Sequence, residues 1–332
     1  MKRRLKKWLV VIINLLFIIA VSSVYAAKIE IEVNCTMKPG GSEEAGIMKF
    51  KELVESRSKG RIKVKPFMSA QLGKEKAVLE LLKIGQTQMA LTGGTYRTMY
   101  AKAYDPVSIP FYIPCWDVAK AYLEGPLGKK MDKIVMEKGG ITVFGPQKRA
   151  PREMTTNKKV VEPEDLKGMK FRLPAVPTWV DVWKELGALP VVIPAPEIYI
   201  AMQTGQVDGH ENTLASPYLK KLWEVQKYII LTNHVYFPWS WVASTKWFNS
   251  LAAADQQLIR RAVDEARAYG SIVEDEKDAF YAKELKKHGM KFITPDIKAI
   301  RAKARPAVQR AVAALAPKVR AEITRLSEKM CH

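Results

Sequence analysis

The sequence predicts a two-domain α/β protein in which one long helix spans both domains. Strand and helix patterns alternate in two separate stretches, as expected when helices cover parallel sheets. A later stretch without proline is long enough to exceed the width of one small domain. The composition, 48% hydrophobic and 9% aromatic, can fill two cores and excludes a disordered chain.

The first alternating stretch predicts three strands and two helices. Apolar and polar residues alternate in two of the strands, Ser42 is a candidate N-cap for the first helix, and Gly60 fits its end. Each helix supplies the crossover that a parallel pair of strands requires. The predicted order is strand 28–36, helix 42–60, strand 61–67, helix 74–84 and strand 88–91.

The second stretch begins near Arg149 and repeats this architecture. It predicts strands at 170–173 and 189–193 and helices at 179–186 and 197–204. From 255 to 287 the helical pattern continues without proline, which corresponds to roughly 50 Å and should cross between the domains. Two further helices, 306–316 and 317–330, are expected to cover the last domain.

These patterns divide the chain into a leader and two domains. We expect domain I to contain residues 27–149 plus about 238–275, and domain II to contain 150–237 plus about 276–332. Residues 1–26 combine a basic start with a short apolar run and small residues, which is typical of a secretory signal peptide cleaved after about Ala26. An uncleaved membrane anchor is the alternative. The mature protein is therefore expected to be exported from the cytoplasm.

The chain is strongly basic. Its formal net charge is +20, and because residues 1–26 contain five basic and no acidic residues, the mature chain would carry +15. Such a balance can indicate nucleic acid, an anionic surface or an anionic ligand. Export argues against nucleic acid. We interpret most of the charge as a solubilising surface, with ligand steering as a supplement.

No catalytic or metal-binding signature is present. The three cysteines, Cys35, Cys115 and Cys331, allow one disulfide in an oxidising compartment, but the sequence does not say which pair forms. The four histidines are scattered, so we expect no metal ion, no cofactor and no catalytic residue. A pair of carboxylates drawn from Glu197, Asp208 and Glu211 would be the basis of an enzyme alternative.

Arg172 is the first candidate for ligand binding. It lies at the end of a predicted strand, just before Pro174, where open α/β sheets place their ligand crevice. The planar guanidinium matches a carboxylate with two parallel hydrogen bonds, which lysine cannot reproduce. The alternative is a surface arginine on an edge strand.

The motifs around Arg172 resemble those of a known family. Residues 163–166 (PEDL), 168–174 (GMKFRLP) and 205–212 (GQVDGHEN), with 71–73 (QLG) before them, are similar to the solute-binding proteins of tripartite ATP-independent periplasmic (TRAP) transporters, of the dicarboxylate-binding DctP-like type. The resemblance covers nearly the whole mature chain. It implies a periplasmic binding protein fold with a hinge, and a protein that captures a small organic acid and delivers it to a membrane permease.

The resemblance also assigns roles to residues. It implies that Arg172 grips the ligand carboxylate, that Arg152 assists it, and that Asn212 hydrogen-bonds the ligand. We expect Trp179, Tyr236, Trp239, Thr92 and Gly93 near the cleft, although aromatic residues there can equally pack the core or the hinge. Where many relatives place a polar or acidic group this chain has Gly93, which favours a mono- or dicarboxylate with an apolar or aromatic body over a sugar acid.

Other function classes share parts of this pattern. The binding protein of an ATP-driven (ABC-type) importer would have a similar architecture, and a periplasmic sensor would bind the same ligand but signal. We expect the protein to act as a monomer with a small carboxylate and TRAP permease subunits as partners. Neither the acid nor the oligomeric state follows from the sequence.

Overall fold

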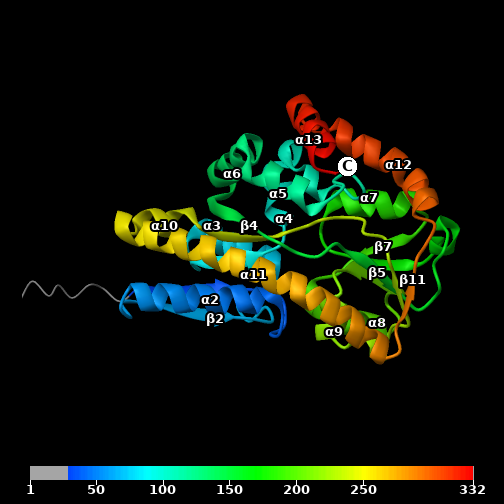
Figure 1. Cartoon of the computed structure of the whole chain (residues 1–332), viewed down its shortest axis with the longest axis horizontal. Coiled ribbons are helices and arrows are strands. Elements are labelled where there is room, and N and C mark those ends of the chain that lie inside the picture. The colour runs from blue at the N-terminus through cyan, green and yellow to red at the C-terminus, as the bar shows by residue number, and fades with distance from the viewer. Residues whose placement is uncertain (1–28, 332) are drawn as a thin grey trace, which may run out of the picture.

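The computed structural model describes residues 29–331, and Figure 1 shows two sheets that lie in different halves of the molecule. Within this range the strands form one sheet of five strands and one of six. The predicted α/β class and the long helix are confirmed. The predicted signal peptide, 1–26, lies outside the described residues.

The two sheets are mixed parallel and antiparallel. The first has the order β2-β1-β3-β10-β4, in which β1 is parallel to β2 and β3 while β10 is antiparallel to β3 and β4. The second has the order β11-β9-β5-β8-β6-β7, with β6 parallel to β7 and β8. The strands are β1 (Ile29–Asn34), β2 (Ile62–Phe67), β3 (Met89–Thr92), β4 (Ile141–Gln147), β5 (Glu153–Thr156), β6 (Lys170–Leu173), β7 (Leu189–Val192), β8 (Gly209–Asn212), β9 (Tyr228–Ile230), β10 (Trp239–Ser244) and β11 (Lys291–Ile293).

Helices cover the sheets and supply the crossovers. They are α2 (Ser42–Arg57), α3 (Glu75–Ile84), α4 (Thr95–Tyr100), α5 (Trp116–Glu124), α6 (Pro126–Gly139), α7 (Pro177–Glu185), α8 (Ile198–Gln203), α9 (Ala215–Leu219), α10 (Thr245–Ser250), α11 (Ala253–Lys287), α12 (Ile297–Ala313) and α13 (Pro317–Met330). Ser42 lies in the first turn of α2 instead of capping it, because Gly41 takes the cap position and the Ser42 hydroxyl donates to Glu274.

The chain passes between the sheets through short segments and one helix. Residues 148–152 lead from β4 to β5, and residues 231–238 return from β9 to β10. Helix α11 crosses the molecule in Figure 1: its first half joins the apolar core of the first sheet through Val263 and Ala266, and its second half packs beside the second sheet through Tyr281 and Leu285. The site described below lies near these crossings.

The C-terminal helices differ from their sequence expectation. Helix α12 begins at Ile297, not at Pro306, because the Asp296 side chain accepts a hydrogen bond from Ala299 N and the proline lies inside the helix. Helix α13 has its predicted bounds, but it packs on α5 beside the first sheet (Figure 1) and not, as expected from the sequence, on domain II. The domain boundaries stay a prediction.

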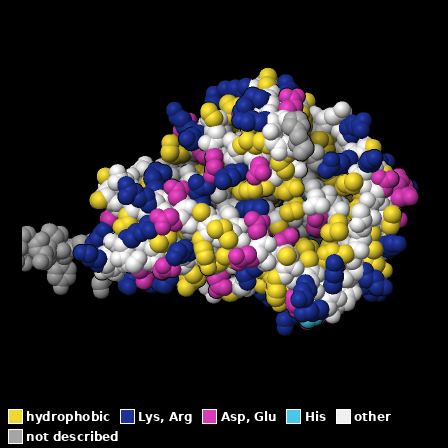
Figure 2. All heavy atoms as spheres, viewed as in Figure 1, with side chains coloured by type: hydrophobic (Ala, Val, Ile, Leu, Met, Phe, Trp, Pro, Cys, Tyr) yellow, Lys and Arg dark blue, Asp and Glu magenta, His cyan; other side chains and the backbone are white. Residues whose placement is uncertain are grey.

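Basic side chains are widely distributed over the surface. Figure 2 shows lysine and arginine across most of the face it draws, interspersed with acidic side chains. This pattern fits a solvated surface better than a single nucleic-acid-binding patch. Among residues 29–331, no helix combines the length and the hydrophobicity needed to cross a bilayer.

A disulfide between Cys115 and Cys331 ties the end of α13 to the start of α5, whereas Cys35 is free and buried.

We predict that replacing both paired cysteines with serine lowers the free energy of unfolding by about 2–5 kcal/mol, because the cross-link closes a long loop in the unfolded chain. Thermal unfolding with and without reductant measures this. Reductant should lower the Tm of the wild type and leave that of the double variant unchanged; an equal shift in both would contradict a stabilising disulfide.

Candidate functional site

A cavity of about 580 Å³ lies between the two sheets. Its lining comes from the segments that follow β1, β3, β6 and β7, and from the end of β8, so it sits at the carboxyl ends of parallel strands, where α/β proteins bind ligands. The lining residues are Thr36, Met37, Lys74, Glu75, Lys76, Ala77, Glu80, Gly93, Thr95, Arg149, Arg152, Arg172, Pro174, Ala175, Trp179, Val192, Ile193, Pro194, Ala195, Pro196, Asn212, Phe237 and Trp239.

Arg172 lies on β6, is only 2% exposed and lines this cavity. Its Nε donates to the Ile193 carbonyl at 2.7 Å, and among the described residues no carboxylate forms an ion pair with it. Burial is the main cause that lowers its pKa to about 9, against the opposing negative charge of Glu211. The guanidinium therefore remains charged at neutral pH, and its terminal nitrogens lack a protein acceptor in the described chain.

Arg152 has a different environment. Its Nε and Nη2 hydrogen-bond the Glu211 carboxylate, and Nη2 also donates to the Glu211 carbonyl at 3.0 Å. His234 Nε2 lies 3.2 Å from the same carboxylate, while the Thr232 hydroxyl lies 2.8 Å from His234 Nδ1. Burial raises the pKa of Glu211, but the positive charge of Arg152 and these hydrogen bonds hold it at about 2. The charge of Arg152 is thus already compensated.

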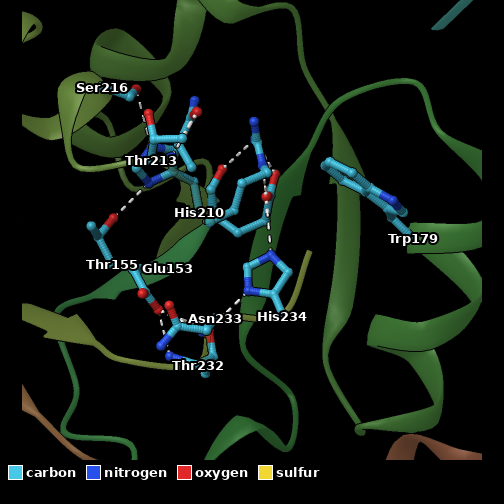
Figure 3. Close-up of polar contacts among 12 residues, drawn as sticks. Glu153, Thr155, Trp179, His210, Thr213, Ser216, Thr232, Asn233 and His234 are labelled. Atoms are coloured by element: carbon cyan, nitrogen blue, oxygen red, sulfur yellow. Dashed lines mark hydrogen bonds and ion pairs between the residues drawn. The ribbon is translucent and has the colours of Figure 1, made fainter. Parts of the chain in front are cut away.

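These contacts belong to a larger buried polar network, part of which Figure 3 shows. The Glu153 carboxylate accepts hydrogen bonds from the backbone N–H groups of Thr232 and Asn233, and His234 lies beside this group in the view. His210 joins Thr155 on the neighbouring strand, with Nδ1 2.5 Å from the hydroxyl oxygen. The network holds β5, β8 and the returning segment 231–238 together behind the cavity.

Asn212 ends β8 and lines the cavity beside Arg149. Its Oδ1 accepts hydrogen bonds from Arg149 Nη2 at 2.6 Å and from Thr213 N at 3.0 Å, so the amide orientation is fixed. Its Nδ2 has no acceptor among residues 29–331 and can donate to a ligand. Trp239, the first residue of β10, lies under the Arg149 guanidinium, with the guanidinium carbon 4.1 Å from the ring centroid.

The remaining predicted residues are divided between the cavity wall and its surroundings. Trp179 and Gly93 line the cavity, and Trp179 Nε1 is already used by the Ser108 carbonyl at 2.7 Å. Thr92 and Tyr236 are not brought to the cavity. The Thr92 hydroxyl donates to Glu75 at 2.8 Å, whereas Tyr236 packs against the apolar cluster beside the first sheet.

Arg149, Glu75 and the segment 192–196 were not found from the sequence. Arg149 lies three residues before Arg152 at the start of the crossing to β5, so its proximity was a usable signal. Segment 192–196 follows a predicted strand, where the same rule that selected Arg172 would have placed it. Glu75 could not be found in this way, because it begins α3 and does not follow a strand. Its carboxylate still lies close to Gly93, where a Cβ would be 3.1 Å from Glu75 Oε1. A helix therefore supplies the acidic group that was expected at the position of Gly93.

The carboxylates considered for catalysis are not paired with one another. Glu211 binds Arg152, Glu197 forms an ion pair with Lys74, and the Asp208 carboxylate accepts from a backbone N–H of β6 at 2.8 Å. Within residues 29–331 no cluster of three or more histidine, cysteine or acidic side chains could hold a metal ion. The geometry is suited to holding an anion.

Residues 34–315 match the family described as bacterial extracellular solute-binding protein, family 7 (DctP). The chain belongs to this family. Its relatives include the C4-dicarboxylate-binding periplasmic protein of Shewanella loihica, which is 27% identical over 278 residues, covering 83% of this chain and 82% of the relative.

Solved TRAP periplasmic solute-binding proteins have the same fold. One from Roseobacter denitrificans with bound L-galactonate has a TM-score of 0.83 and 27% identity, covering 90% of this chain and 98% of its own. One from Shewanella oneidensis with bound succinate has a TM-score of 0.86 and 26% identity, covering 90% and 99%. These DctP-family proteins are periplasmic transport proteins, not enzymes, and both of these solved structures are TRAP solute-binding proteins.

The Arg152–Glu211 pair of this DctP-family chain gives a prediction for stability. The pKa of Glu211 is about 2 in the folded state and 4.5 ordinarily. The contribution of its charged form to the free energy of unfolding is therefore present above pH 4.5 and is lost as the pH falls from 4.5 through 2. Glu211→Gln leaves Arg152 buried without its counter-charge and should cost about 3–5 kcal/mol at pH 7.

Urea unfolding between pH 2.5 and 7 measures both effects. The wild type should lose stability over the acid range more steeply than Glu211→Gln. Glu137→Gln, an exposed carboxyl on α6, serves as the control and should follow the wild type. Parallel pH curves for the wild type and Glu211→Gln would contradict the ion pair.

Proposed function

We propose that this chain is the periplasmic solute-binding subunit of a TRAP transporter, and that it captures a small organic acid through a bidentate contact between Arg172 and the ligand carboxylate. The observation that carries the proposal is a buried guanidinium that lines the cavity without a carboxylate partner in the described chain. A buried charge is costly unless it is paired, and a ligand carboxylate supplies the partner.

The surroundings of Arg172 favour an oriented contact. The bond from Nε to the Ile193 carbonyl fixes the plane of the group and leaves its two terminal nitrogens for the parallel geometry that a carboxylate fits. Asn212 Nδ2 can add a donor. Arg152 is already paired with Glu211 and contributes as a positioning group. The Trp179 ring packs under it, with the ring centroid 4.9 Å from the guanidinium carbon of Arg152.

The cavity wall indicates what the body of the ligand is like. Trp179, Phe237 and Trp239 form aromatic surface, and segment 192–196 with Pro174 adds aliphatic surface. Such a wall favours an acid whose body is largely apolar. Related proteins of the same fold bind L-galactonate and succinate, which supports a ligand of four to six carbon atoms in this cavity.

Capture would involve closure of the two lobes about residues 148–152, 231–238 and α11. In the described structure Lys74, before α3, and Glu197, before α8, form an ion pair that joins the lobes at the cavity wall. Both side chains are about half exposed, so the pair adds little energy and can open. The closed, loaded protein would then dock as a monomer on the membrane permease.

Export is supported by the basic and apolar pattern of residues 1–26, with cleavage proposed after about Ala26. The Cys115–Cys331 disulfide is also in keeping with an oxidising compartment such as the periplasm.

Arg172→Gln tests the carboxylate contact. The variant should bind the acids found by a thermal-shift screen of the wild type about thirtyfold or more weakly, a loss of about 2–5 kcal/mol, because the carboxylate would enter a dry site without its counter-charge. Isothermal titration calorimetry measures the affinity. Lys170→Gln removes an exposed positive charge two residues earlier on the same strand and should bind like the wild type. Equal affinities for the wild type and Arg172→Gln would remove Arg172 from the site.

The transport role has a separate test. A strain lacking this protein should lose uptake of the radiolabelled acid, and the wild-type gene should restore uptake while the Arg172→Gln gene should not. Unchanged uptake with a lost transcriptional response to the acid would indicate a sensor.

A further inference from the structure

Arg149 is a second buried arginine in the cavity lining, and the family motifs did not point to it. It is 5% exposed and lies in the crossing segment between the sheets. Its flat face rests on Trp239 and its Nη2 donates to Asn212 Oδ1, so two other cavity-lining residues fix its position. Such a group is pre-organised.

The hydrogen-bonding capacity of Arg149 is incompletely used. Its Nε is buried and has no hydrogen-bond partner, and among the described residues no carboxylate forms an ion pair with it. Burial and the positive charge of Arg152 lower its pKa to about 10, while the negative charges of Glu43 and Glu274 oppose this. The side chain is therefore a buried cation at neutral pH with free donors.

A structural arginine of the same chain shows the contrast. Arg97 is 1% exposed, and the Asp105 carboxylate lies 3.3 Å from its Nε while the Ser240 hydroxyl accepts from Nη1 at 2.9 Å. The fold thus provides this packing arginine with a carboxylate. Arg97 Nη2 is also without a hydrogen-bond partner, but Arg97 borders a space of only about 10 Å³. Arg149 has no paired carboxylate and lines the cavity of about 580 Å³.

Arg149 and Arg172 together present to one cavity two guanidinium groups that form no ion pair with a carboxylate of the described chain, whereas Arg152 is paired with Glu211. A monocarboxylate can pair with only one of them. We propose that Arg149 binds a second acidic group of the ligand, so that the protein selects diacids over monoacids; this rests on the proposed function of Arg172.

The other charged lining residues are less suited to that role. Glu75, at the start of α3, repels an anion, and its negative charge already acts on Arg172. Lys74 is exposed and paired with an acidic side chain, and Lys76 is exposed at the rim, where water screens its charge. Arg149 is the buried position that can compensate a second anionic group.

The test compares matched ligands on matched variants by calorimetry. The probes are succinate, glutarate and adipate, each beside its monoamide, which keeps one carboxylate and a similar shape. Arg149→Gln should weaken binding of the best diacid about tenfold or more, the effect of a lost charge-assisted hydrogen bond, and leave the monoamide within about twofold. Arg149→Lys, which keeps the charge without the fork, should fall between them.

Lys148→Gln is the control, because Lys148 is adjacent in sequence and pairs with Asp275 outside the cavity, at 2.5 Å. It should not change the preference for diacids. Circular dichroism and thermal unfolding confirm that each variant is folded, and if Arg149→Gln is not, Arg149→Lys decides alone.

An equal loss for diacid and monoamide, or no loss for either, would overturn the assignment of Arg149. So would a wild-type protein that binds none of the diacids. If that protein still binds a monoacid in an Arg172-dependent way, the proposed function stands and only the second contact fails.

Discussion

The buried guanidinium groups around one cavity set the main physical constraint on this protein. A guanidinium removed from water needs acceptors and a counter-charge, and the described chain supplies them fully to Arg152 through Glu211 but only partly to Arg149 and Arg172. The lining is otherwise largely apolar, so water cannot replace a counter-ion once the lobes enclose the space. In the proposed function an anionic ligand completes the site, and this would make a largely apolar cavity selective for acids.

The scaffold holds these groups where the lobes are joined. Glu274 on α11 accepts hydrogen bonds from the Ser42 hydroxyl and from Ala150 N, and so links the long helix to the first lobe and to the crossing segment that carries Arg149. A Cβ on Gly270 would lie 2.5 Å from a side chain at the end of β4, so glycine permits the close approach of α11 to that strand. If the lobes close on the ligand as proposed, the change in their orientation would reach Arg149 through few intermediate contacts.

Part of this arrangement could be predicted from the sequence. Strand-ending position selects Arg172, and the absence of proline between 255 and 287 predicts the long helix, since both follow from local backbone rules. The predicted helix start at Pro306 is wrong, because the Asp296 side chain caps α12 at its true beginning. The proline is tolerated inside α12 because the helix is anchored on α7 through Ile300 and Ala304.

Contacts between distant segments could not be predicted. The pairing of Cys115 with Cys331 depends on α13 lying on α5, and the contact between Thr92 and Glu75 depends on how α3 docks beside β3. Arg149 could have been noted from its place three residues before Arg152 in the sequence. Only the structure shows that its guanidinium stacks on the ring of Trp239 and forms no ion pair with a carboxylate of the described chain.

The most direct measurement is a crystal structure of the mature protein with the acid that it binds most tightly. We predict a ligand carboxylate within hydrogen-bond distance of both terminal nitrogens of Arg172, enclosed between the two lobes. An acid bound elsewhere, or held in the cavity with the Arg172 nitrogens facing water, would contradict this.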